Sequence, residues 1–264
     1  NKATIIKYGA KGNYTVPPIP YGANITPHPT YSVYSSVTNS LNFYSCAYLK
    51  NTGQILLTGN TSNGGNFSSM WNNTAEGNAY KSDPATFHAI QIYPAGYAFA
   101  AMSIENKVIA WGSSSYGGTI PNDIQAHLDS KHILHIYSTE RAFIAHSSTG
   151  DIFAWGRVIN TSNSGKYIYL ASENNNVTIT QVIPNTNSVI LLKSDGSIVG
   201  IGYNDYGASL TSNRYGTIKT IKKIVARRYG FMVLNTDETT CCWGDGQISN
   251  SEYNNMSSGV YDIF

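Results

Sequence analysis

Asp151-Ile152-Phe153-Ala154-Trp155-Gly156 is the stretch that decides the fold, because its last three residues recur along the chain. Ala110-Trp111-Gly112 and Cys242-Trp243-Gly244 repeat them, and Gly200-Ile201-Gly202 is a weaker copy. The final glycines of the four copies are separated by 44, 46 and 42 residues. A period of this size in a turn-rich chain is typical of a solenoid, a propeller or an array of repeats.

Each copy contains three short apolar segments separated by turns. In the copy around Trp155 the first two are Ile133–Tyr137 and Ala142–Ala145, and Thr149-Gly150 precedes the third. Short runs of β-branched and aromatic residues bounded by turn residues predict strands, and Asp195-Gly196 in the next copy predicts a hairpin. Helical spacing is weak apart from a short helical turn at Asp123–Lys131. We therefore expect an all-β chain.

The same pattern extends toward both ends of the chain. Residues 98–110 and 44–59 each contain a further hairpin, whereas residues 3–9 resemble only the last strand of a unit and residues 260–264 only the first. Five complete hairpins and two end pieces predict a closed β-propeller of six blades, with seven as the alternative and about 40–50 residues per blade. Pairing the two ends in one blade would remove exposed sheet edges. We expect residues 1–264 to be a single propeller domain from a longer surface protein.

Further residues accompany the Trp-Gly strand in these repeats. A Gly-Asp-Gly-like turn precedes it, and Tyr116-Gly117-Gly118 and Ile120-Pro121 follow it. Together these residues resemble the divergent regulator-of-chromosome-condensation-like repeats of bacterial surface proteins, over about residues 40–264. The resemblance implies a β-propeller. Eukaryotic relatives bind chromatin and drive nucleotide exchange on a small GTPase, a role that needs a basic surface absent here, so only the fold is carried over.

The composition favours a recognition module. Only 12% of the residues are charged, against about 25% in average proteins, while the chain has 20 tyrosines and a net charge of +2. Such a surface is typical of proteins that contact glycans or other proteins. Lys219–Arg228 is the only basic run, and its alternation with apolar residues indicates a strand with a solvated face, so no nucleic-acid partner is expected. No apolar stretch approaches the roughly 20 residues of a membrane span, so we expect no direct membrane insertion.

The sequence lacks the residue patterns of known catalytic sites. There is no Gly-x-Ser-x-Gly motif and no glycine-rich loop followed by Lys-Ser or Lys-Thr. The aspartates recur at repeat turns, where turn chemistry explains them better than a calcium site at Asp205 and Asp245. Cys241 and Cys242 are neighbours in a strand and face opposite sides, so buried free thiols are expected. We expect no enzyme, no cofactor and no metal, and the oligomeric state stays open.

The four tryptophans fall into two groups. Trp111, Trp155 and Trp243 occur once per unit at a strand end, which predicts a structural wedge between blades. Trp71 lies outside the repeat, in the insertion 60–78. An aromatic side chain in a Gly/Asn-rich loop is a candidate ligand contact.

Antiparallel topology predicts where the remaining binding residues gather. Alternate connections of a blade emerge on the same face, so the turn between the first two strands shares a face with the loop after the Trp-Gly strand. We call this the loop face, and the side of the short turns before the Trp-Gly strands the hairpin face. Tyrosine and arginine are enriched at interface hot spots. Together with Trp71, the candidate ligand-binding residues are Tyr97, Tyr116, Glu140, Arg141, Tyr203, Tyr206, Arg227, Arg228 and Tyr229.

These observations predict a non-enzymatic extracellular recognition module, the binding tip of a bacterial adhesin that contacts a host-cell surface protein or glycan. Its expected location is extracellular or on the bacterial cell surface. One alternative is a multivalent sugar-specific lectin, and a second is an intracellular scaffold or small-GTPase regulator. The loops after the Trp-Gly strands share little sequence, which disfavours the equivalent pockets that the lectin would need.

Overall fold

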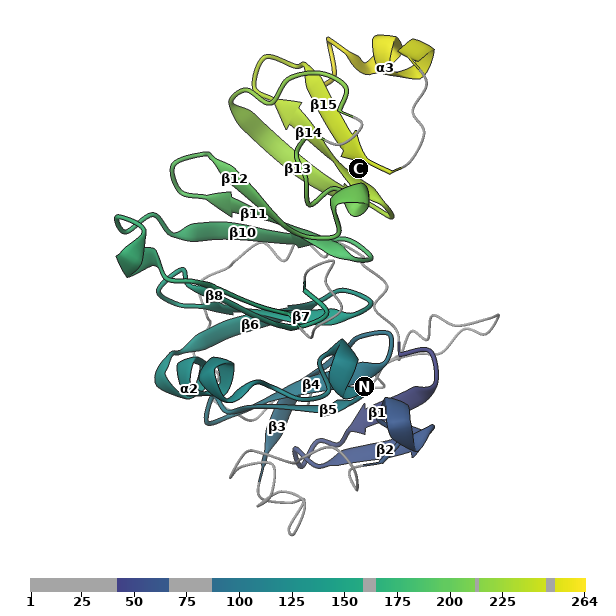
Figure 1. The fold of residues 1–264 in the computed structure, drawn as a ribbon, viewed down its shortest axis with the longest axis vertical. Coiled ribbons are helices and arrows are strands. Elements are labelled where there is room, and N and C mark those ends of the chain that lie inside the picture. Colours follow the sequence, from purple (N-terminus) through teal and green to yellow (C-terminus); the bar gives the residue numbers. More distant parts are fainter. Residues whose placement is uncertain (1–41, 67–86, 159–164, 212–213, 246–249) are drawn as a thin grey trace, which may run out of the picture. The chain divides into compact units, whose positions relative to one another are not determined.

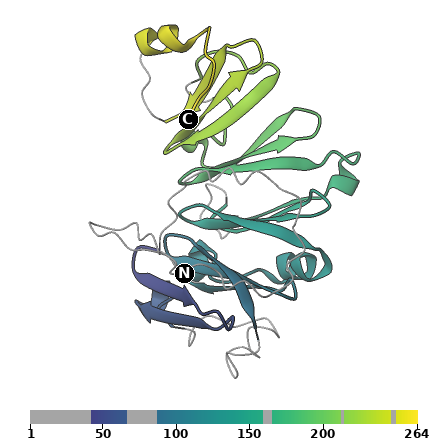
Figure 2. The ribbon, with the colours of Figure 1, turned by 180° about the vertical axis from the view of Figure 1, so that it is seen from behind.

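The computed structural model describes residues 42–66, 87–158, 165–211, 214–245 and 250–264, all within the compact unit Ser36–Phe264. These residues form five antiparallel sheets in chain order, seen from opposite sides in Figures 1 and 2. Residues 1–41 of the expected single domain lie outside the described part. The strands are β1 (Ser45–Leu49), β2 (Ile55–Gly59), β3 (Ala89–Pro94), β4 (Ala98–Ser103), β5 (Val108–Gly112), β6 (Ile133–Ser138), β7 (Ala142–Ser147), β8 (Ile152–Gly156), β9 (Gly165–Tyr169), β10 (Ile179–Pro184), β11 (Ser188–Lys193), β12 (Ile198–Gly202), β13 (Ile221–Arg227), β14 (Gly230–Asn235) and β15 (Thr240–Gly244).

The sheets follow the repeat. The three apolar segments of each unit become consecutive strands in the orders β3-β4-β5, β6-β7-β8, β10-β11-β12 and β13-β14-β15, while β1 and β2 form a hairpin. The all-β class is confirmed. Strand β9 is an addition to this pattern, because it pairs with β8 as a fourth strand.

Two α-helices of the described residues lie outside the sheets. Helix α2 (Asn122–Ser130) confirms the helical turn expected at Asp123–Lys131, and it buries Ile124 and Leu128. Helix α3 (Asn250–Met256) has no counterpart in the expected pattern. No described helix is both long and apolar enough to cross a bilayer.

Residues 260–264 do not form the strand that their sequence predicted. Side chains take up polar groups that a neighbouring strand would otherwise use: the Lys222 amine donates to the Tyr261 carbonyl (2.9 Å), and the Ile263 amide donates to the Asp262 carboxylate (2.8 Å). The Lys223 amine also pairs with Asp262 (2.8 Å). Lysine side chains therefore link this segment to β13, and its Val260 amide donates to the Glu238 carbonyl (3.0 Å) instead of to a neighbouring strand.

The core lies between successive sheets, because both faces of a sheet are apolar. In β7, Phe143 and Ala145 pack with side chains of the preceding sheet, whereas Ala142 and Ile144 pack with side chains of the following one. This is the alternation that a strand imposes on its side chains. A unit therefore buries its apolar surface only by stacking on its neighbours, as expected for a repeat fold.

The Trp-Gly residues tie each unit to the one before it. The Trp155 indole N–H donates to the Gly117 carbonyl of the preceding unit (3.0 Å), and its ring stacks on Phe143, with centroids 5.4 Å apart. Trp111 and Trp243 donate in the same way to Gly64 and Gly207 (3.2 and 2.9 Å). All three tryptophans are buried. These contacts are the ones that a wedge between units requires.

Three short 3-10 turns place the accepting glycines: η1 (Thr61–Asn63), η2 (Ser114–Tyr116) and η4 (Asn204–Tyr206). A further turn, η3 (Ala171–Glu173), is followed by Asn174 instead. Gly64, Gly117 and Gly207 directly follow η1, η2 and η4, with φ of 101°, 94° and 95°. A side chain disfavours this left-handed backbone, and a Cβ on Gly117 would lie 2.7 Å from the Phe143 ring. Glycine is therefore required where the backbone meets the next unit.

Candidate recognition surface

The turns between first and second strands form a hydrogen-bonded series from sheet to sheet. The Phe43 amide donates to the Gly96 carbonyl (2.9 Å), the Gly96 amide to the Glu140 carbonyl (2.8 Å), and the Glu140 amide to the Thr186 carbonyl (2.8 Å). Because each turn is bonded to the next one, the backbone fixes the spacing of the side chains that these turns carry.

The loops after the third strands join the same face, as the antiparallel topology predicts. Each loop is bonded to a turn of its own sheet: the Ser113 amide to the Tyr97 carbonyl, the Arg157 amide to the Arg141 carbonyl, and the Tyr203 amide to the Asn187 carbonyl (2.9, 2.8 and 3.2 Å). The loop face is thus built from two loops of each of three sheets.

Aromatic rings cover the first part of this face. Tyr97 stacks on Tyr116, with centroids 4.5 Å apart, and Phe43 and Tyr44 lie 5.5 and 5.7 Å from Tyr97. The Arg141 guanidinium lies 5.9 Å from the centroid of Tyr116, within cation–π range. Phe43 and Tyr44 are more than half exposed, so this end of the row is open to solvent.

The second part continues across the next two sheets. Arg157 lies over Tyr203, 5.7 Å from its centroid. Tyr203 contacts Tyr206 edge to face at 6.0 Å, and Tyr206 contacts Tyr229 at 5.1 Å. Arg228 lies over Tyr229 at 4.9 Å. We call the whole set the tyrosine–arginine row: Phe43, Tyr44, Tyr97, Tyr116, Arg141, Arg157, Tyr203, Tyr206, Arg228 and Tyr229.

Arg141 joins the two parts of the row. Burial lowers the pKa of its guanidinium, but the nearby Tyr203 hydroxyl and Glu140 carboxylate outweigh burial, so the pKa is raised above its ordinary value. The Arg141 Nε lies 3.4 Å from the Glu140 carboxylate. Both side chains are mostly covered, with exposed fractions of 29% and 20%. The pair is therefore a fixed part of the surface rather than two free charges.

The structure brings together most of the residues predicted from the sequence: Tyr97, Tyr116, Glu140, Arg141, Tyr203, Tyr206, Arg228 and Tyr229. It does not bring Arg227 into the row. Burial raises the pKa of the Cys242 thiol, and the Arg227 charge opposes that rise, which places Arg227 near Cys242. Trp71 lies outside the described residues.

Three members of the surface were missed by sequence reasoning. Phe43 and Tyr44 precede the first strand of the described chain, and Arg157 directly follows a Trp-Gly motif. Arg157 could have been found, because Tyr203 occupies the equivalent position one unit later. Tyr44 could also have been found, because it directly precedes β1 as Tyr97 directly precedes β4. Phe43 had no such signal, because its equivalent next to Tyr97 is Gly96.

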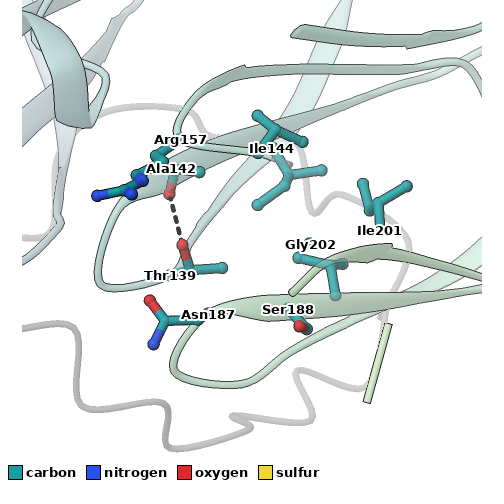
Figure 3. A pocket seen from close by; sticks show the side chains of 10 residues that line it. Thr139, Ala142, Ile144, Arg157, Asn187, Ser188, Ile201 and Gly202 are labelled. Atoms are coloured by element: carbon teal, nitrogen blue, oxygen red, sulfur yellow. Dashed lines mark hydrogen bonds between the residues drawn. The ribbon is translucent and has the colours of Figure 1, made fainter. Parts of the chain in front are cut away.

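A small cavity lies beneath the row between the sheet containing β7 and the sheet containing β11. In Figure 3, Arg157, Thr139 and Asn187 lie at one end of it, and Ile144 and Ile201 at the other. The space open to a water-sized sphere is about 10 Å³, close to the lower limit for one water molecule. The cavity is a recess beneath a surface site and cannot enclose a whole ligand.

The described residues offer little to a metal ion or to nucleophilic chemistry. They contain no group of three or more His, Cys, Asp or Glu side chains placed to hold a metal. Burial raises the pKa of the Cys241 thiol to about 11, so this thiol is protonated at neutral pH. Cys241 and Cys242 are both free and buried, as expected.

Comparison with known proteins supports the fold. No family model and no curated protein matches the chain. Human WBSCR16 is similar in structure, with a TM-score of 0.51 and 13% identity over 83% of this chain and 64% of that one. Yeast RCC1 (Prp20) bound to Kap60 has a TM-score of 0.45 and 14% sequence identity, over 68% of this chain and 49% of that one. Prp20p from Saccharomyces cerevisiae has a TM-score of 0.44 and 16% sequence identity, over 60% of this chain and 45% of that one. Its structure was solved in a study of its binding to Gsp1p and histones.

The chain thus spans about half the length of the yeast protein. The structural neighbours include RCC1 β-propeller proteins, the group whose repeats the sequence resembles. At these identities the likeness concerns the fold alone.

Proposed function

We propose that this protein is a non-enzymatic recognition module that binds another protein through the tyrosine–arginine row. The observation that carries the proposal is the continuity of the row, because side chains from successive sheets contact one another from Phe43 to Tyr229, with Arg141 and the Tyr203 hydroxyl joining the two parts. Tyrosine and arginine are the residues that dominate binding energy at protein interfaces. Their rings and guanidiniums already contact one another in the folded chain, and side chains positioned in advance lose less entropy on binding.

The setting that fits this proposal is a bacterial surface, outside the cell, with a host-cell surface protein as the partner. Its support is the resemblance of the repeats to those of bacterial surface proteins and the low content of charged residues, 12%. A host glycan and an intracellular GTPase-type partner are the alternatives. The row favours a protein partner, because it is extended and aromatic rather than divided into equivalent pockets.

We also infer that the sheets belong to a closed propeller of six blades, seven being the alternative. The support is the five hairpins of the described residues and the sheet-to-sheet packing of the apolar side chains. Closure would bring the turns of all blades onto one face, in a ring rather than a line.

Electron microscopy of the protein with its captured partner tests both points. The partner is isolated by cross-linking from surface-labelled host cells and then purified, and the complex is imaged. We expect six blades in projection and partner density over the turns that carry Tyr97, Glu140 and Tyr229. Density over the hairpin face would refute the assignment of the binding surface, and an open stack of sheets would refute closure.

A further inference from the structure

The carboxamide oxygen of Asn187 is buried and has no hydrogen-bond partner among the described residues. Only 7% of this residue is exposed. The backbone of Asn187 is nevertheless fully engaged. Its amide donates to the Asn185 side chain (3.1 Å), and its carbonyl accepts from the Tyr203 amide (3.2 Å). The turn therefore fixes the backbone of Asn187, whereas its side-chain oxygen is left without a hydrogen bond. Buried polar atoms without a partner are rare in native structures, so this one needs an explanation.

Arg157 links the recess to the row. Its guanidinium lies over the Tyr203 ring, and Arg157 lines the same recess as Asn187. The Tyr203 hydroxyl itself lies near the Arg141 guanidinium, whose pKa it raises, so it is not part of the recess.

The charge at this place is positive. No carboxylate among the described residues forms an ion pair with Arg157. Glu140 already pairs with Arg141. The next acidic residue along the row, Asp205, is exposed, and its carbonyl accepts the backbone amide of Asp245. Among the described residues, the recess is therefore lined by one guanidinium without a counter-charge and by one unused carboxamide oxygen.

We propose that this recess binds the carboxylate of an aspartate or glutamate of the protein partner. The carboxylate would accept hydrogen bonds from the Arg157 guanidinium. The backbone N–H of the same partner residue would donate to the Asn187 carboxamide oxygen. The ligand thereby satisfies both groups, and arginine is well suited to a carboxylate. This inference rests on the proposed function and names the chemistry of one contact within it.

The size of the recess favours a peptide over a sugar. A space of about 10 Å³ admits one carboxylate oxygen but not a sugar ring, so the rest of the ligand has to lie on the surface above it. There it meets the tyrosines of the row, which suit the flat contact of a peptide. An acidic sugar such as sialic acid shares the carboxylate and is therefore an alternative that the experiment has to separate.

The test uses the whole chain and defined probes. A random peptide library displayed on phage is selected on the protein, and the enriched peptides are synthesised in two versions, one with Asp or Glu and one with Asn or Gln. We expect acidic residues to be enriched and the acidic version to bind at least tenfold more tightly by fluorescence anisotropy. This comparison alters only the probe, so it does not depend on how any variant folds.

Matched variants then locate the contact. Arg157→Gln is expected to weaken the acidic peptide at least tenfold, whereas Arg214→Gln, which removes the same charge from an exposed residue elsewhere, leaves the affinity unchanged. Asn187→Ala is expected to weaken binding without lowering the melting temperature, because the lost carboxamide oxygen had no partner. A purely structural role for Asn187 would instead lower the melting temperature.

Three results would overturn this inference: no enrichment of acidic peptides, equal effects of Arg157→Gln and Arg214→Gln, or binding of sialyllactose in place of the peptides with the same dependence on Arg157. The proposed function is tested separately. If variants of Arg228 and Tyr229 abolish binding of the whole partner while Arg157→Gln leaves it intact, the row functions in recognition but the recess is not an acidic-residue site.

Discussion

Replacing Trp155 with alanine is expected to lower the free energy of unfolding by about 3–5 kcal/mol, the range for truncation of a large buried aromatic. The Trp155 ring is fully buried, with an exposed fraction of 0%, and it stacks on Phe143. Its N–H donates to the Gly117 carbonyl. The alanine variant would lose the ring packing, leave a cavity and remove the partner of that carbonyl.

Urea unfolding followed by circular dichroism measures this effect. Trp155→Phe serves as the control, since it keeps an aromatic ring but removes the N–H, and we expect it to cost clearly less than alanine. A midpoint of Trp155→Ala close to wild type, together with loss of partner binding, would show that this tryptophan contacts the ligand and is not a wedge.

The second large effect is expected at Gly117, on the other side of the same contact. Gly117→Ala should cost about 2–5 kcal/mol, combining the strain of a side chain at positive φ with overpacking. The added Cβ would lie 2.7 Å from a Phe143 ring carbon, and the φ of Gly117 is 94°. The ring cannot retreat easily because Trp155 is stacked on it.

Gly196 supplies the matched control. Its φ is 81°, but a Cβ there would meet nothing within 4 Å. Gly196→Ala should therefore cost only the backbone strain, about 1–2 kcal/mol. The difference between the two variants in thermal or urea unfolding isolates the steric contribution between units. Equal losses of unfolding free energy for the two variants would mean that the close approach of Gly117 to Phe143 does not contribute to stability.

Much of the fold could be predicted because the repeat depends on interactions between residues close in sequence. The Trp-Gly strands, the turn at Asp195-Gly196 and the alternating apolar residues of β7 each reflect a rule that acts over a few residues. The prediction of a strand at 260–264 was wrong for the opposite reason. Its apolar residues fit a strand, but long-range contacts with Lys222 and Lys223 determine its conformation.

The loop face could be predicted in part for a similar reason. Antiparallel topology assigns Tyr97, Arg141 and Tyr203 to one face without knowledge of their contacts. It cannot say which rings touch, because this depends on hydrogen bonds between turns far apart in sequence, such as that from Gly96 to Glu140. The unused carboxamide of Asn187 was equally out of reach, since the absence of a partner is a property of the folded chain.

A comparison of binding between two double variants tests the central claim most directly. Arg228→Ala with Tyr229→Ser removes one end of the tyrosine–arginine row. Ser148→Ala with Thr236→Ala alters exposed hydroxyls on the hairpin face that form no hydrogen bond within the described residues. Thr149 and Ser194 would be poorer controls, because their hydroxyls contact Asp151 and the Thr178 amide.

The dissociation constant of each variant for the captured partner is measured by isothermal titration calorimetry, and folding is verified by the melting temperature. We predict at least a tenfold loss of affinity for the Arg228 and Tyr229 variant, about 1.4 kcal/mol, and no change for the hairpin-face variant. Unchanged affinity on the loop face together with a loss on the hairpin face would contradict the assignment of the recognition surface.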